Sequence, residues 1–484
     1  MKERLKAIFK GPVVFYPLLF AAFPMLFLYT YNIDETAVSE IWLPLVISVA
    51  AALVLWAVLS LMLGSLSKAG LATAIFLVFF FSYGHLCEEL DYLGVFVPKH
   101  AHLLSVMLFV WGYCVYFISR AKRDFRVTTR LFNITAVVLI AINVFNIASY
   151  QINLDRLNTA TPEEPPAQAS TNAAELSTLP DIYLIITDEY AHPDTMQEWY
   201  DYDNSEFIES LEDKGFFVAH ESRTRVMVTR YSIATTLNME YIPLAKPRKI
   251  VAQMIFTNKV LDFLKQRGYK HAFLKWMSGG GGAYEVYTDL PGDFQSPERN
   301  YLMTDFFRLL WNTTMLRPFY NHIYGPEYIR SWRNGLIDTL SHLNSMPDIE
   351  GPKFVLAHLM CPHEPFVFGP DGELVDIRNV SNYADKQFYL GQYIFMSREL
   401  ERLVEVILEK SSNPPIIIIQ SDHGLRPQHP NIEIGPDEWQ KILNAMYLPG
   451  MDNAVLCDNM SPANTFRVIF NHYFGANYPL LEDD

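Results

Sequence analysis

Five long apolar stretches in the first third of this chain constrain its fold more than any other feature. They run over Val13–Tyr31, Ile41–Leu63, Leu71–Leu86, His102–Ile118 and Leu131–Tyr150. Most of them approach the ~20 apolar residues that a helix needs to cross a bilayer, and the third is the shortest. Hydrophobic residues make up 50% of the 484-residue chain, and the excess lies in this part. We therefore predict a transmembrane domain of five helices over residues 1–150.

The charges between these stretches predict how the chain is oriented. The loop between the fourth and fifth stretches carries Arg120, Lys122, Arg123, Arg126 and Arg130. The loops after the first and third stretches carry Asp34, Glu35, Glu40, Glu88, Glu89 and Asp91. Because basic loops stay in the cytoplasm, we expect a cytoplasmic N-terminus. The chain would then be a multi-pass protein of a bacterial-type inner (cell) membrane, with everything after Tyr150 periplasmic or extracellular.

Overall charge and cysteine usage exclude several other classes. The formal net charge of −15 argues against nucleic acid as a partner. The four cysteines show no CxxC spacing, so they indicate neither a disulfide framework nor a zinc knuckle.

After a linker predicted over residues 151–180, which is rich in Thr, Pro, Ala and Glu, the composition over 181–484 is that of a globular α/β domain. Strands are expected at Asp181–Thr187, Phe216–Ala219, Lys270–Leu274, Lys353–Leu359 and from Ile416 onward. Helices are expected at Ser205–Gly215, from about Ser232 to Met239, at Asn258–Gly268 with Asn258 as N-cap, and at Ser397–Lys410. Alternating strands and helices predict a mostly parallel sheet covered on both faces.

The segment Tyr301–Tyr324 is rich in aromatic and aliphatic residues and has two interpretations. It is either a helix packed on the core of the domain or a surface helix that touches the bilayer.

Polar side chains follow three of the predicted strands. Asp188 comes after the first, His358 and His363 end the central one, and the pair Asp422-His423 follows the apolar run from Ile416. Singly, each has an ordinary interpretation as a turn, cap or structural residue. Because ligands of open α/β sheets lie at the carboxyl ends of the strands, their shared placement favours one site. Two carboxylates with imidazoles suit Zn²⁺ or Mn²⁺.

Thr229 is the candidate nucleophile, since it lies where a loop enters a predicted helix. A helix N-terminus attracts phosphate or sulfate, and a metal ion would lower the pKa of the hydroxyl. The alternative is a capping hydroxyl without chemistry. Trp276 and the run Gly279–Gly282 follow a strand, where they either line a substrate pocket or form a mobile glycine loop.

Taken together, Asp188, Thr229, the His358/His363 pair and Asp422-His423-Gly424 resemble the alkaline phosphatase superfamily in its sulfatase-like branch. Within that branch the layout is similar to membrane phosphoethanolamine transferases and lipoteichoic acid synthases, which have five spans before an extracytoplasmic catalytic domain. The stretch Thr229–Thr235 resembles the one that carries their nucleophilic threonine. The resemblance therefore implies an alkaline-phosphatase-like (sulfatase-like) α/β domain over residues 181–484.

The resemblance also implies roles for single residues. Asp188, Asp422, His423 and Thr229 would hold one or two divalent ions, Zn or Mn, and Thr229 would attack phosphorus. His358 or His363 would contact the substrate phosphate, help a second metal ion or protonate a leaving group.

His429 and Trp276 are further substrate-binding candidates. Either Asp188 or its neighbour Glu189 is the ligand that follows the first strand, and related proteins favour Asp188. The chain lacks Cys-x-Pro-Ser-Arg, so the formylglycine mechanism of true sulfatases is not expected.

The function implied is transfer of a phospho-substituent, of phosphoethanolamine or phosphoglycerol type, from a membrane lipid donor to a glycan or lipid head-group acceptor. A hydrolase of the same fold, acting as phosphodiesterase or phosphatase, is the first alternative. An inactive sensor or assembly protein is the second, and the intact set of site residues argues against it.

Overall fold

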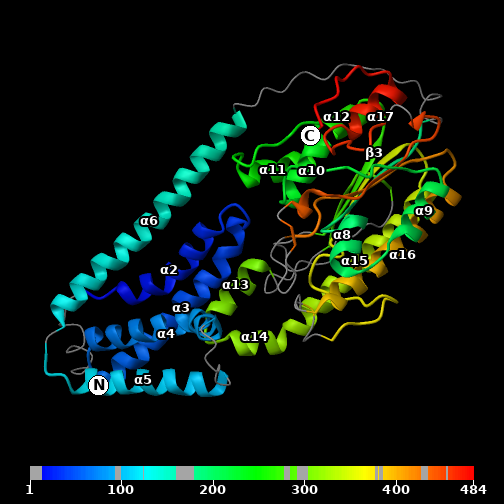
Figure 1. Cartoon of the computed structure of the whole chain (residues 1–484). Helices are drawn as coiled ribbons and strands as arrows, with labels where there is room; N and C mark the ends of the chain where they lie inside the picture. Colours follow the sequence, from blue (N-terminus) through cyan, green and yellow to red (C-terminus); the bar gives the residue numbers. More distant parts are fainter. Residues whose placement is uncertain are drawn as a thin grey trace. The chain divides into compact units, whose positions relative to one another are not determined.

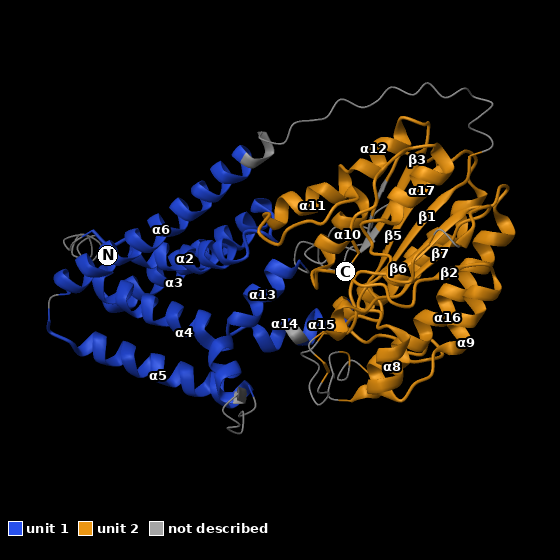
Figure 2. Ribbon diagram, turned by 45° about the horizontal axis from the view of Figure 1, so that its top comes forward, with its two compact units in different colours: residues 1–161, 279–281, 300–327 blue, residues 162–278, 282–299, 328–484 orange. Residues whose placement is uncertain are grey.

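The chain forms two compact units, shown in different colours in Figure 2. The first combines residues 1–161 with 279–281 and 300–327, and the second holds 162–278, 282–299 and 328–484. The computed structural model describes residues 13–92, 100–123, 125–159, 179–276, 284–291, 304–376, 380, 385–426, 434–435, 437–453 and 456–483.

All five apolar stretches of the first unit are helical. They form α2 (Tyr16–Tyr31), α3 (Trp42–Leu63), α4 (Leu66–Tyr92), α5 (His100–Arg120) and α6 (Arg126–Thr159), with a short 3-10 helix η1 (Val38–Ile41) before α3. Among the described residues, four helices are long and apolar enough to cross a membrane, whereas α2 has only 16 residues. Large apolar side chains such as Met62 and Phe109 are exposed on them, as expected of helices that face lipid. The chain is therefore a membrane protein, and its described residues include four helices of spanning length.

Two further described helices belong to the first unit, although they are distant in sequence from its other helices. α13 (Asp305–Thr313) and α14 (Arg317–Ile323) lie in the predicted aromatic segment. Phe306 of α13 packs with Tyr29, Ile33 and Ile41 in one buried cluster. The domain boundaries predicted from the sequence had placed this segment in the outer domain, so its inclusion among the apolar helices is a finding of the structure.

The second unit is built on one seven-stranded sheet in the described part of the chain. Its strands are β1 (Ile182–Thr187), β2 (Phe217–Val218), β3 (Lys270–Trp276), β4 (Tyr284–Thr288), β5 (Lys353–Leu359), β6 (Ile416–Ser421) and β7 (Asn444–Tyr447), in the order β2-β7-β6-β1-β5-β3-β4. The central strands β6, β1, β5 and β3 are parallel. The outer pairings β2–β7, β6–β7 and β3–β4 are antiparallel. The expected mostly parallel sheet is thus parallel only in its centre, and the whole sheet is mixed.

Helices cover both faces of this sheet (Figure 1). Those of the second unit are α8 (Pro193–Tyr200), α9 (Ser205–Asp213), α10 (Thr229–Asn238), α11 (Arg248–Phe256), α12 (Lys259–Lys265), α15 (Gly325–Ser345, whose first turn belongs to the first unit), α16 (Lys386–Lys410) and α17 (Thr465–Phe474), with 3-10 turns η3 (Met346–Asp348) and η4 (Glu438–Gln440).

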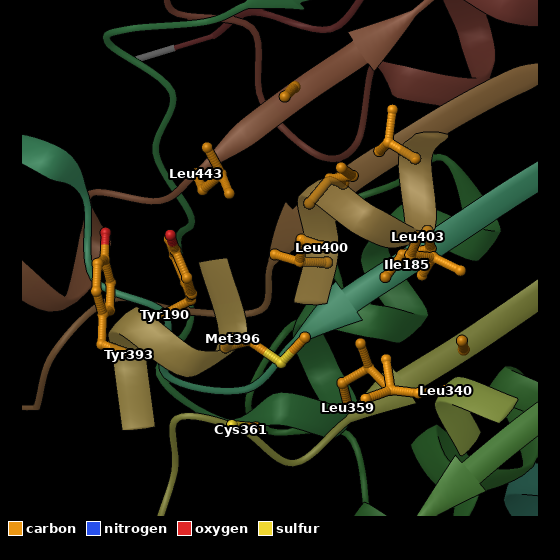
Figure 3. Close-up of a cluster of buried hydrophobic side chains, with 14 of the residues drawn as sticks. Ile185, Tyr190, Leu340, Leu359, Cys361, Tyr393, Met396, Leu400, Leu403 and Leu443 are labelled. Carbon is orange, nitrogen blue, oxygen red and sulfur yellow. The ribbon is translucent and has the colours of Figure 1, made fainter. Parts of the chain in front are cut away.

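Alternate residues of the central strands enter two separate cores. Tyr183 and Ile185 of β1 pack with α8, α9, α15 and α16, whereas Leu184 packs with α10, α11, α12 and α17. Figure 3 shows the first core, which includes Ile185 of β1 together with Leu400 and Leu403 of α16. Since both faces are buried, a central strand needs apolar residues at every position, which explains the uninterrupted isoleucines of β6.

Candidate metal centre

The candidate site residues gather where the parallel strands β1, β5 and β6 end. Because these strands are adjacent and parallel, their carboxyl ends meet at one edge of the sheet. Asp188 donates its backbone N–H to Leu359 O at 2.9 Å, and Asp422 donates to Thr187 O at 3.3 Å. These bonds continue the sheet by one residue and fix the backbone of both carboxylates.

Three of the predicted ligands form one buried cluster. One side-chain atom from each of Asp188, Asp422 and His423 lies within 4.8 Å of the others. His423 Nδ1 lies 2.8 Å from Gly424 O, and since a carbonyl only accepts, Nδ1 carries the hydrogen. Nε2 is then the ring atom that faces the cluster, where it lies 3.4 Å from Asp422 Oδ2 and 3.0 Å from Arg426 Nη2. A divalent cation bound here would accept an electron pair from Nε2 and from Asp422 Oδ2.

The hydrogen bonding of the carboxylates supports the same conclusion. Asp422 Oδ1 accepts from the backbone N–H of Glu189 at 3.0 Å and of His423 at 2.8 Å. Asp422 Oδ2 and Asp188 Oδ1 are buried and have no hydrogen-bond partner among the described residues. Buried carboxylate oxygens without a partner are costly, and a bound cation removes that cost. This donor set fits Zn²⁺ or Mn²⁺.

The two carboxylates also perturb each other. Burial raises the pKa of Asp422, and the negative charge of Asp188 raises it further, against the opposing effect of His423 and His358. Burial also acts to raise the pKa of Asp188, but His363, His358 and His423 outweigh it and the net shift is downward. The cluster therefore holds one carboxylate firmly ionised beside another that resists ionisation, which a divalent cation would relieve.

Thr229 joins this cluster from α10, of which it is the first residue. Its hydroxyl donates to Asp188 Oδ2 at 3.3 Å, and its hydrogen bonding also lowers the pKa of Asp422. The N-cap is Val228, so Thr229 does not cap its own helix and the alternative interpretation as a capping hydroxyl is wrong. The oxygen lies at a helix N-terminus beside two carboxylates, a position suited to an anionic substrate.

The two histidines of the β5 end occupy different surroundings. His358 is buried, and its Nε2 lies 3.1 Å from Asp188 Oδ2, so it orients that carboxylate. His363 is less buried and its Nδ1 lies 2.6 Å from Glu364 O. Burial acts to lower the pKa of His363, but Asp188 and Glu189 outweigh it and raise the pKa above its usual value.

Glu189 and Arg426 lie next to the cluster of Asp188, Asp422 and His423. Glu189 was predicted only as an alternative ligand to Asp188, and Arg426 was not predicted. Glu189 has a φ of 59°, and its Oε1 accepts the backbone N–H of Arg426 at 3.2 Å. Arg426 Nη2 lies 3.0 Å from His423 Nε2, and Nη1 lies 3.3 Å from His363 Nε2. Asp188, and not Glu189, thus lies in the three-residue cluster. The sequence signal that could have led to Arg426 is its place just beyond the Asp-His-Gly stretch.

The structure does not describe the side chains of two other predicted site residues, His429 and Trp276. His429 is not among the described residues. Trp276 ends β3, but its side chain is not described, nor are Gly279–Gly282.

Open α/β proteins bind their ligands at the carboxyl ends of their parallel strands, and the candidate ligand atoms of this chain lie at that edge. The family model described as Sulfatase matches residues 180–450, more than half of the chain, and the chain belongs to this family.

Several solved structures resemble the chain at low identity. The C-terminal periplasmic domain of EcEptC from Escherichia coli is 13% identical, covers 66% of this chain and 92% of that chain, and has a TM-score of 0.41. The integral membrane protein lipooligosaccharide phosphoethanolamine transferase A (EptA) from Neisseria meningitidis is 13% identical, covers 94% of each chain and has a TM-score of 0.41. The putative sulfatase yidJ from Bacteroides fragilis is 11% identical, and the match covers 63% of this chain and 75% of that chain with a TM-score of 0.38. A search of curated proteins finds no match.

Proposed function

We propose that this protein is a metal-dependent membrane transferase that moves a phospho-substituent from a lipid donor to a glycan or lipid head-group acceptor through phospho-Thr229. The observation that carries the proposal is the hydrogen bond of 3.3 Å between the Thr229 hydroxyl and Asp188, beside the cluster of Asp188, Asp422 and His423. The donor set and the buried oxygens without partners support a divalent ion, Zn or Mn, at these residues.

The first step forms a bond from Thr229 Oγ to phosphorus and breaks the bond from phosphorus to the glyceryl oxygen of the donor. Diacylglycerol leaves, and its oxygen gains the proton that Thr229 lost. A divalent ion bound at the cluster would supply the positive charge that lowers the pKa of the Thr229 hydroxyl. The N-terminus of α10 stabilises negative charge on the phosphoryl oxygens.

The second step transfers the group to the acceptor. An acceptor hydroxyl attacks the phosphorus of phospho-Thr229, and the bond to Thr229 Oγ breaks. We assign this proton transfer to His363 and not to His358, because His358 Nε2 contacts Asp188 whereas His363 directs Nδ1 at Glu364 O, so that its Nε2 can accept a proton. Nε2 takes the proton from the hydroxyl and returns it to Thr229 Oγ. The raised pKa of His363 favours this role.

The apolar helices suit a donor that is dissolved in the bilayer. We propose that α2 also crosses the membrane, its 16 residues being supplemented by Val13, Val14 and Phe15, which gives five spans. With the basic residues of the α5–α6 loop inside, the N-terminus is cytoplasmic and the sheet domain is periplasmic or extracellular.

The first prediction concerns the nucleophile. Thr229→Ala removes the attacking oxygen, so we expect the rate of donor cleavage to fall by more than about 1000-fold. The full-length protein in vesicles containing phosphatidylethanolamine and phosphatidylglycerol is incubated with metal, and mass spectrometry is used to find the adduct on Thr229. The mass of the adduct identifies the group transferred.

Thr236→Ala is the matched control, because this hydroxyl lies on the same helix but bonds to Ser232 O. Full activity of Thr229→Ala, or the absence of any adduct on Thr229, would refute the proposal. Comparison of lipids and surface glycans with and without the gene separates transfer from hydrolysis. A head-group modification that disappears with the gene indicates transfer, whereas release of the free phospho-substituent into water indicates the hydrolase.

A further inference from the structure

The guanidinium of Arg426 faces two residues with different proposed roles. Nη2 is 3.0 Å from Nε2 of the candidate ligand His423, and Nη1 is 3.3 Å from Nε2 of His363. Both rings direct Nδ1 at a backbone carbonyl, so both Nε2 atoms are acceptors and the guanidinium donates to each. The arginine therefore places its donors between the candidate metal ligand and the residue proposed to move the proton.

The backbone of Arg426 is fixed by the site itself. Its N–H donates to Glu189 Oε1 at 3.2 Å. Glu189 is buried, and its own N–H donates to Asp422 Oδ1 at 3.0 Å. The start of the arginine side chain is thus connected through one residue to a carboxylate of the cluster, which limits where the guanidinium reaches.

The negative charge of the site indicates what the guanidinium of Arg426 does. Asp188, Glu189 and Asp422 place three buried carboxyl groups at this edge of the sheet. A substrate phosphodiester brings a further negative charge, and like charges repel strongly in a buried setting. A divalent cation offsets two of the carboxylates, and the guanidinium offsets the third. Without Arg426 the site would still repel an anion.

We propose that Arg426 binds the phosphoryl oxygens that are not exchanged, both in the lipid donor and in phospho-Thr229. The planar guanidinium presents paired donors that match a phosphate, which a lysine ammonium does not. This inference rests on the proposed function, since it assigns the anion-binding residue of the same site. Donors that turn to the phosphate leave His363 Nε2 to accept the proton of the acceptor hydroxyl.

The experiment uses inorganic phosphate as the probe, with the full-length protein in detergent after loading with Zn²⁺. Calorimetry measures phosphate affinity, and elemental analysis measures bound metal. We expect Arg426→Ala to retain its metal but to bind phosphate about 10- to 100-fold more weakly, as expected for loss of hydrogen bonds to a charged group. Arg426→Lys should recover part of the affinity, and added guanidinium ion should restore binding in Arg426→Ala.

Arg402→Ala is the matched control, because this exposed arginine of α16 pairs only with Glu399 among the described contacts. Arg426→Gln replaces the alanine variant if that variant does not fold. Phosphate affinity within twofold of the wild type in a metal-loaded Arg426 variant would overturn the inference while leaving the proposed function intact. Loss of metal together with phosphate would also overturn it, since Arg426 would then only position His423. A wild-type protein that binds no phosphate and forms no Thr229 adduct would overturn both.

Discussion

Gly424 is the residue that lets the Asp-His pair approach the neighbouring chain. A Cβ atom at this position would lie 2.4 Å from Lys441 O and 2.6 Å from Glu438 O. Both are backbone atoms that a side-chain rotation does not move. Gly424 also accepts the Nδ1 hydrogen of His423 on its carbonyl, and its own N–H donates to Trp439 O at 2.8 Å. The glycine of the Asp-His-Gly stretch therefore sets the orientation of His423.

We expect Gly424→Ala to weaken metal binding, because the backbone shift that relieves the clash also moves the carbonyl that orients His423. Loss of such an orienting contact typically costs about 10- to 100-fold in metal affinity. The measurement is the metal content of the purified full-length protein during dialysis against a chelator. Gly435→Ala is the control, since its Cβ would meet only side-chain atoms of Glu438, Cγ at 3.6 Å and Oε1 at 3.8 Å. Equal retention of metal in the two variants would contradict this account.

The site could be predicted from the sequence only as far as strand ends reveal it. The parallel strands bring Asp188, His358, Asp422 and His423 to one edge, as expected, and their roles remain predictions. Arg426 was not predicted, because its position depends on the irregular chain after β6 and on the hydrogen bond from its backbone N–H to Glu189. Neither the irregular chain nor this hydrogen bond leaves a periodic pattern in the sequence.

At the level of elements, the central strands and the edge strand β2 were predicted, whereas β4 and β7 were not. β5 has the predicted bounds Lys353–Leu359, because the apolar run Phe354–Ala357 marks a strand that is buried on both faces. β4 and β7 were missed, and their lengths of five and four residues do not explain this, because the shorter β2 was predicted. The N-cap role of Asn258 is confirmed, as its side chain accepts from Leu261 N at 2.7 Å. α16 begins at Lys386, well before the predicted start at Ser397. Its first turns were missed because they carry buried tyrosines and not a regular apolar stripe.

The start of α8 introduces a dependence of stability on pH. His192 is its N-cap, and Nδ1 accepts the backbone N–H of Asp194 at 3.2 Å, which requires the neutral ring. Burial lowers the pKa of His192 below 6.5, aided by Lys441 and His220 and opposed by Asp194. A lowered pKa in the folded state means that the unfolded chain binds the proton first. The contribution of His192 to stability is therefore present above about pH 6.5 and is lost as the pH falls from there toward the folded-state pKa.

We expect His192→Asn to flatten this dependence, because asparagine also caps a helix and does not titrate in this range. The thermal midpoint of the full-length protein in detergent, recorded between about pH 8 and pH 5, measures the slope. The wild-type midpoint should fall more steeply than that of the variant. Parallel curves would show that His192 is not the group responsible. His322→Asn serves as a control at a histidine of α14 that caps no helix start.

At the level of the whole molecule, residues 300–327 belong to the same compact unit as the apolar helices. In the sequence, however, they lie between two stretches of the sheet domain. Phe306 and Phe307 of α13 are buried, and Met315 donates its backbone N–H to Phe80 O of α4 at 3.0 Å. An apolar helical face in a sequence does not reveal what covers it. This is why the sequence left open whether the segment packs on the core of its own domain or contacts the bilayer, and the structure places it against membrane helices.

Gly84 of α4 makes this packing possible, and it provides the last prediction. A Cβ atom there would lie 1.9 Å from Asn312 O and 2.7 Å from Thr313 Cα, so even alanine requires the backbone at the end of α13 to move. We expect Gly84→Ala to break the bond from Met315 N to Phe80 O and to speed hydrogen exchange of the Met315 amide several-fold, measured by mass spectrometry in detergent. Gly112→Ala in α5 is the control, because its Cβ would meet nothing within 4 Å. Unchanged exchange at Met315 in Gly84→Ala would mean that α4 and the segment after α13 do not pack in this register.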